Sequence, residues 1–144
     1  MWARHNISPL HGDSRVALRT LFDGPLSGLP SRTLFFYLDA HWNDDLPLVE
    51  EIDIVFSRCP SAIVVIDDFQ VPFDAGYGYD DYGPGKALAP QYIAPAVSAH
   101  RLQAFFPSTP SADEGGERRG CVVLAKQNPH SLVLGSISLL CRAA

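Results

Sequence analysis

The sequence predicts a single α/β domain, and three observations lead to this fold class. Two short apolar runs at residues 33–38 and 61–66 have the β-branched and aromatic composition of buried strands. Between them, residues 47–58 show helical spacing, and further along the chain two more apolar runs flank a polar, glycine-containing segment, as in a β-hairpin. Because 47% of the 144 residues are apolar, one core can form, and we expect residues 1–144 to be one domain.

The first predicted helix covers residues 15–22, where Leu18, Leu21 and Phe22 recur at helical intervals. Ser14 precedes this segment and is the predicted N-cap, because serine is among the residues favoured at that position. A Gly-Pro pair follows, so the helix is expected to end in a loop.

A βαβ unit is predicted next. The run at residues 33–38 indicates a strand covered on both faces that stops at Asp39, and the run at 61–66 indicates a second strand that stops at Asp67. A proline at the start and two glutamates in the first turn favour a helix over residues 47–58. Its predicted buried face consists of Leu48, Ile52, Val55 and Phe56.

The rest of the chain gives weaker signals. Residues 71–86 contain four glycines and three interleaved tyrosines, and we predict a long mobile loop there. A short helix over 86–97 should follow, and strands at 100–106 and 120–126 should form an antiparallel hairpin at the sheet edge. Residues 132–140 are apolar enough to pack, but their periodicity does not distinguish a helix from a strand.

Acidic side chains follow both strands of the βαβ unit. Parallel strands joined by a right-handed crossover end at the same edge of the sheet, so Asp39, His41, Asp67 and Asp68 are expected to lie together, where ligands bind in such sheets. Converging carboxylates suit a hard divalent cation such as Mg²⁺ or Ca²⁺, and the histidine could act as a general base. The alternative is that Asp67 caps the following turn and Asp39 is solvated at the start of a loop.

Composition excludes several classes of function. The net charge is −5, from 16 acidic and 11 basic residues, and no basic cluster is longer than two residues, so we expect no nucleic-acid partner. The three widely spaced cysteines indicate buried free thiols in a reducing compartment. No signal-peptide pattern and no apolar run of about 18 residues is present, so we expect a cytoplasmic protein without a membrane partner.

Four motifs, taken in order, resemble the second half of a class I S-adenosylmethionine-dependent methyltransferase. They are GDS at 12–14, FYLDAH at 36–41, VVIDDF at 64–69 and GCVVL at 120–124, and the resemblance extends over residues 5–126. It is closest to the bacterial metal-dependent O-methyltransferases. The fold that the resemblance implies is a partial Rossmann-like sheet with helices on its faces and a C-terminal antiparallel hairpin, lacking the first strands of the complete fold.

The resemblance also implies a function. Asp39, Asp67 and Asp68 would bind Mg²⁺, which would orient a small-molecule hydroxyl for attack on the methyl group of S-adenosylmethionine, with Asp39 and His41 as the catalytic residues. The family's glycine-rich cofactor turn would precede residue 1, so the cofactor-binding residues are unknown. We expect a chain without its first strands to form a homo-oligomer that completes the sheet.

Two other hypotheses remain open. The chain could be a non-catalytic module that keeps the fold and self-associates, with neither metal nor cofactor affinity. The segment DAHWN at 39–43 also resembles the manganese motif of ureohydrolases, although Asn43 stands where that motif has aspartate. No Gly-x-Gly-x-x-Gly turn occurs, so a complete dinucleotide site is not predicted.

Overall fold

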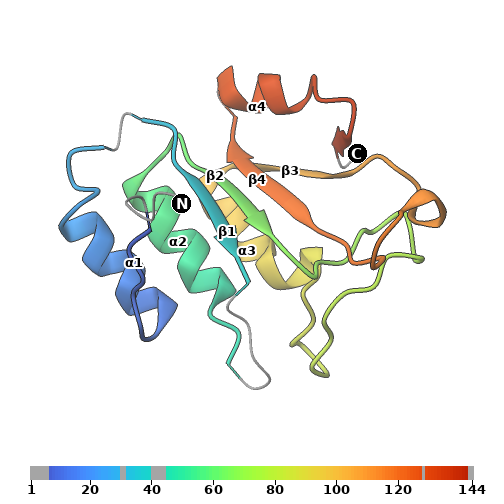
Figure 1. Cartoon of the computed structure of the whole chain (residues 1–144), viewed down its shortest axis with the longest axis horizontal. Coiled ribbons are helices and arrows are strands. Elements are labelled where there is room, and N and C mark those ends of the chain that lie inside the picture. Colours follow the sequence, from blue (N-terminus) through green and yellow to red (C-terminus); the bar gives the residue numbers. More distant parts are fainter. Residues whose placement is uncertain (1–6, 30–31, 40–44, 128, 143–144) are drawn as a thin grey trace, which may run out of the picture.

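The computed structural model describes residues 7–29, 32–39, 45–127 and 129–142. The helices in this part of the chain are α1 (Ser14–Asp23), α2 (Leu48–Arg58), α3 (Pro90–His100) and α4 (Pro129–Leu134), together with a 3₁₀ turn at Ser111–Asp113. The strands are β1 (Phe35–Leu38), β2 (Ile63–Ile66), β3 (Leu102–Pro107), β4 (Val122–Lys126) and β5 (Leu140–Arg142). Figure 1 shows their arrangement.

The strands form one five-stranded mixed sheet in the order β1-β2-β4-β3-β5. β1 and β2 are parallel, with Leu38 opposite Ile66, whereas β4 is antiparallel to both of its neighbours. The α/β class, the parallel βαβ unit and the antiparallel hairpin are therefore confirmed. The predicted place of the hairpin at the sheet edge is wrong, because β4 lies inside the sheet and β5 borders β3 on the outer side.

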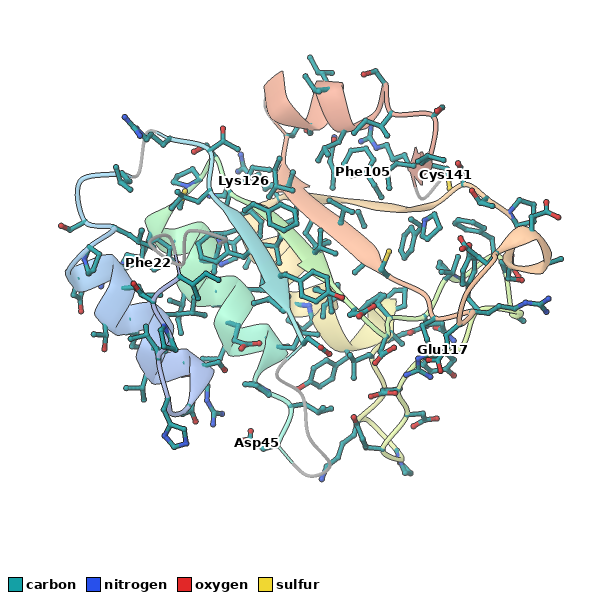
Figure 2. The ribbon with its side chains drawn as sticks, in the orientation of Figure 1. Phe22, Asp45, Phe105, Glu117, Lys126 and Cys141 are labelled. Atoms are coloured by element: carbon teal, nitrogen blue, oxygen red, sulfur yellow. The ribbon has the colours of Figure 1, made fainter. Side chains whose placement is uncertain are left out.

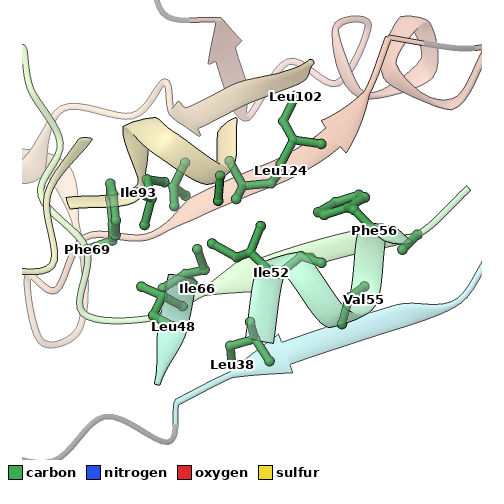
Figure 3. Close-up of a cluster of buried hydrophobic side chains, with 14 of the residues drawn as sticks. Leu38, Leu48, Ile52, Val55, Phe56, Ile66, Phe69, Ile93, Leu102 and Leu124 are labelled. Carbon is green, nitrogen blue, oxygen red and sulfur yellow. The ribbon is translucent and has the colours of Figure 1, made fainter. Parts of the chain in front are cut away.

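The main core lies between the sheet and helices α1, α2 and α3. Alternate strand residues point to this side, among them Leu38, Ile66 and Leu124, because successive side chains of a strand face opposite ways. The predicted apolar face of α2 packs here, and its four residues are at most 1% exposed. Figure 3 shows these side chains meeting between the strands and the helices. Burial of apolar surface on this side of the sheet stabilises the fold by about 25 cal/mol per Å².

The opposite face of the sheet is only partly covered. α4 packs there, and Leu134 joins Phe105 and Val123 in a second, smaller cluster. On β1, however, Phe35 is 65% and Tyr37 is 56% exposed. The prediction that this strand is covered on both faces is therefore wrong, because α4 lies over β3 and β4 and no helix described here covers β1 from this side.

Two helices begin at residues other than those predicted. Asp13, not Ser14, is the N-cap of α1, because its extended backbone lets the carboxylate accept a hydrogen bond from the N–H of Arg15 at 2.8 Å. α3 begins at Pro90 rather than near residue 86, since proline has no N–H to donate and is suited to the first turn.

The segment between β2 and α3 is a long loop, as predicted, and backbone hydrogen bonds connect it to the rest of the chain. The N–H of Asp80 donates to the carbonyl of Asp68 at 2.9 Å, and the N–H of Leu88 donates to the carbonyl of Asp80 at 2.9 Å. Gly78 forms a bridge with Arg119, from the segment before β4. Backbone hydrogen bonds of this kind restrain a loop, and its mobility stays a prediction.

Candidate functional site

The carboxyl ends of β1 and β2 carry the first two predicted site residues. Asp39 follows β1 and is exposed, and Asp67 follows β2 and is half-buried. The N–H of Asp67 donates to the carbonyl of Leu38 at 3.2 Å, so the parallel register continues to the end of both strands. The topology thus brings these two acidic positions to one edge, as expected. His41 lies outside the described residues, as do the other positions at 40–43 on which the ureohydrolase hypothesis depends.

A tyrosine from the neighbouring strand binds the second of these carboxylates. The Tyr37 hydroxyl donates a hydrogen bond to the Asp67 carboxylate. This bond to a charged acceptor stabilises the neutral phenol, and it raises the pKa of Tyr37 to about 12. Tyr37 is therefore a proton donor to Asp67 at neutral pH and does not act as a base. This pair was not predicted from the sequence, because 30 residues separate its members.

Asp68 has a different partner, the guanidinium group of Arg119. Its Nε donates to Asp68, and its Nη2 donates to Asp80 in the loop after β2. The second oxygen of Asp80 accepts a hydrogen bond from the Tyr82 hydroxyl at 2.6 Å, and this bond raises the pKa of Tyr82 to about 12. The two carboxylates raise the pKa of Arg119, because each stabilises its charged form. We call Asp68, Asp80 and Arg119 the arginine bridge.

This arrangement does not fit a magnesium site made of three aspartates. A divalent cation takes oxygen ligands that converge on one point, and no group of three metal-ligating side chains does so among the described residues. Asp68 has a guanidinium group as its counter-ion, and Asp67 accepts a hydrogen bond from a phenol. The metal site at Asp39, Asp67 and Asp68 stays a prediction, and we derive no chemical step through a metal.

Glycine at position 120 allows the segment before β4 to approach the end of β2 closely. The N–H of Phe69 donates to the carbonyl of Gly120 at 2.9 Å, and the N–H of Gly120 donates to Gly78 at 2.8 Å. A Cβ at this position would lie 2.2 Å from the carbonyl oxygen of Phe69. Only glycine therefore permits this contact, which sets the position of the neighbouring Arg119. In Figure 2, Glu117 marks the region where this segment meets the loop after β2.

Tyr77 attaches the same loop to the segment between β3 and β4. Its side chain is 4% exposed, and its hydroxyl lies 3.0 Å from the carbonyl oxygen of Thr109 and 2.9 Å from a carboxylate oxygen of Glu114. Burial is the largest cause that raises the pKa of Tyr77 to about 12, so the phenol is a permanent donor at neutral pH. Tyr77, Tyr82 and Asp80 of the loop thus hold it against the rest of the structure.

A buried carboxyl lies beside the first strand end. Glu51 of α2 is 1% exposed, and its Oε1 has no hydrogen-bond partner among the described residues. Burial raises its pKa, and Ser14 and Arg15 oppose this effect. Glu51 and Asp39 line an open cleft of about 270 Å³ between α1 and β1, so this edge of the sheet combines acidic groups with an apolar wall.

At the strand ends, Asp39 and Asp67 present carboxylates to one edge of the sheet, and Asp68 forms an ion pair with Arg119. Sequence reasoning missed Arg119, although the Arg-Arg pair is the only such basic cluster in the chain and stands just before a predicted strand.

No described helix is long and apolar enough to cross a membrane. The three cysteines are free, as expected; Cys59 is buried as predicted, whereas Cys121 and Cys141 are only partly buried.

No protein-family model, curated protein or solved structure matches this chain.

Proposed function

We propose that the chain is the acceptor-side half of a methyltransferase-like α/β unit, derived from an S-adenosylmethionine-dependent O-methyltransferase that acts on a small-molecule hydroxyl. The observation that carries the proposal is the sheet topology together with its acidic strand ends. The parallel strands β1 and β2 are followed by Asp39 and Asp67, and β4, the second strand of the antiparallel hairpin, lies beside β2. A Rossmann-like half-sheet with a C-terminal hairpin is the fold that the resemblance implies.

The open side of the sheet supports the same proposal. β1 is an edge strand, and its aromatic side chains Phe35 and Tyr37 are largely exposed on the face without a covering helix. An edge strand with exposed apolar residues is expected where further strands and helices belong. In the proposed unit these further elements would bind the cofactor, to which we assign no residue of the described chain.

In the proposed reaction, S-adenosylmethionine would supply the methyl group, and the acceptor hydroxyl would lose its proton when its oxygen is methylated. Asp39 is the group placed to accept that proton, because its carboxylate is exposed at the strand end. His41 is the second predicted proton acceptor. Tyr37 keeps Asp67 hydrogen-bonded and does not take up the proton, since the pKa of Tyr37 is raised to about 12.

Isothermal titration of the full chain with S-adenosylmethionine, with and without Mg²⁺, tests the proposal. We expect saturable binding of S-adenosylmethionine, and Asp39→Asn should leave this binding intact. We also expect methyl transfer to small phenols or alcohols, and the same substitution should abolish it. Asp45→Asn is the matched control, because Asp45 is also exposed near this edge and pairs with Arg15. Absence of cofactor binding in both conditions would refute an active enzyme for this chain.

A second candidate is favoured by the exposed aromatic residues of β1. A non-catalytic module that self-associates would cover Phe35 and Tyr37 against a second copy and complete the open sheet. Light scattering on the wild-type chain and on a Phe35→Ser, Tyr37→Ser variant separates the two candidates. A dimer that becomes monomeric in the variant, with no cofactor binding, favours this module, whereas a wild-type monomer rules it out.

A further inference from the structure

A buried carboxyl group lines the cleft where α1, α2 and β1 meet (Figure 1). Glu51 is 1% exposed, and no residue in the described part of the chain forms a hydrogen bond to its Oε1. Buried polar atoms are nearly always paired in folded proteins, because an unpaired atom has lost its hydrogen bonds to water without replacement. Glu51 therefore offers an unused hydrogen-bonding atom to a molecule that enters the cleft.

The charges around Glu51 favour a positively charged ligand. Burial raises the pKa of Glu51, Ser14 and Arg15 oppose this effect, and Asp13 and Asp45 reinforce it. Arg15 does not pair with Glu51, because its guanidinium group binds Asp13 at 2.5 Å and Asp45 at 2.8 Å. These three carboxyl groups share one arginine, so a cation that enters the cleft is attracted and an anion is repelled.

The rest of the cleft is mainly apolar. Side chains from α1 and β1 supply this part of the wall, and they include Ala17, Leu18, Leu21, Phe36 and Leu38. Asp39, at the end of β1, adds a second carboxylate to the lining. The volume of about 270 Å³ is sufficient for one ring with a short polar arm, since a cavity of about 150 Å³ can hold benzene. The cleft thus combines an apolar wall with acidic groups.

We propose that this cleft binds a small primary amine that carries an aromatic ring or a branched aliphatic group. The ammonium group donates a hydrogen bond to the unpaired oxygen of Glu51, and the apolar group packs against Leu18 and Phe36. An ammonium ion suits the site because it supplies both a donor and a positive charge, and hydrogen bonds between charged groups are the stronger ones. This inference does not rest on the proposed function, because binding of an amine needs neither a cofactor nor methyl transfer.

NMR titration of the full ¹⁵N-labelled chain with 2-phenylethylamine tests the proposal at about pH 7.5, where an alkyl amine is protonated. We expect saturable binding with a Kd of about 1 mM or below, and amide shifts at Leu18 and Glu51. The neutral analogue 2-phenylethanol should bind at least about tenfold more weakly, and the anion 3-phenylpropionate should not bind. The proposal is overturned if the amine does not saturate, if the alcohol binds equally well, or if the shifts lie away from the cleft.

Three variants separate the charge of Glu51 from the shape of the cleft. Glu51→Gln keeps the shape and should weaken amine binding about tenfold or more, without changing the binding of the alcohol. Glu50→Gln is the matched control and should bind the amine like the wild type, because Glu50 is exposed and pairs with Arg19. Ala17→Leu keeps the carboxyl groups but fills the cleft, and it should bind neither compound.

Two results with these variants would also overturn the proposal. The first is amine binding by Glu51→Gln that equals that of the wild type or of Glu50→Gln. The second is amine binding by Ala17→Leu with the affinity of the wild type, and this test remains decisive if Glu51→Gln does not fold.

Discussion

Replacing Gly120 by alanine should destabilise the protein strongly. The new Cβ would lie 2.2 Å from the carbonyl oxygen of Phe69 and 2.9 Å from a methyl group of Val71, and the first of these atoms belongs to the backbone. The two segments would have to separate by about 1 Å, a shift of the kind that overpacking imposes. This movement would lengthen the hydrogen bond from the N–H of Phe69 to the carbonyl of Gly120, which is 2.9 Å long.

The magnitude follows from these two effects. Overpacking costs about 1–3 kcal/mol, and a weakened buried hydrogen bond adds about 1 kcal/mol, so we expect a loss of about 2–4 kcal/mol in the free energy of unfolding. For a domain of this size, that loss corresponds to a fall in Tm of about 10 °C. Differential scanning calorimetry and urea titration would measure both quantities.

A glycine with free space around it provides the control. A Cβ at Gly115 would meet nothing within 4 Å, so Gly115→Ala should change the stability by less than about 1 kcal/mol. If Gly120→Ala melts within about 2 °C of Gly115→Ala, the close approach of the two segments is not a feature of the folded protein, and the anchoring of the arginine bridge loses its basis.

Other substitutions test the core and the buried polar groups. Phe56→Ala should lose about 3–5 kcal/mol in urea titration, because the ring is fully buried, and a loss below about 1 kcal/mol would contradict its place in the core. Tyr77→Phe should lose about 1–2 kcal/mol, because its hydroxyl bonds to Glu114 and a backbone carbonyl; equal stability would show that these bonds do not form. Burial raises the pKa of Glu51 above 4.5, so the folded state binds its proton more tightly than the unfolded state, and stability should fall as the pH rises from about 4.5 through the raised pKa. Glu51→Gln should remove this fall and should be at least as stable as the wild type at pH 7.5. The exposed control Glu50→Gln should keep the pH dependence of the wild type. Parallel pH profiles of the wild type and Glu51→Gln would refute the raised pKa of Glu51.

Local patterns predicted much of the fold. The apolar runs placed both parallel strands to within two residues, and the face of α2 was predicted correctly, because burial on one side of a helix leaves a period in the sequence. The secondary structure of short segments was predicted less well. Residues 132–140 contain the end of α4 and the start of β5, and a change of structure within so few residues leaves no period to detect.

The candidate site was predictable only as far as topology goes. That Asp39 and Asp67 meet at one edge follows from parallel pairing of consecutive strands. Which group neutralises each carboxylate does not follow, because the partners are far away in the chain. Arg119 is 51 residues from Asp68, and Tyr37 reaches Asp67 from another strand.

The sequence by itself determined the α/β class, the βαβ unit and the acidic strand ends, since these depend on residue type and short-range spacing. Only the tertiary structure decided that one face of β1 is open and that Asp68 is bound by a guanidinium group. The physical reason is that coverage and charge pairing are relations between distant segments. Hydrophobicity indicates which residues can be buried, but the packing of the other elements decides which of them are.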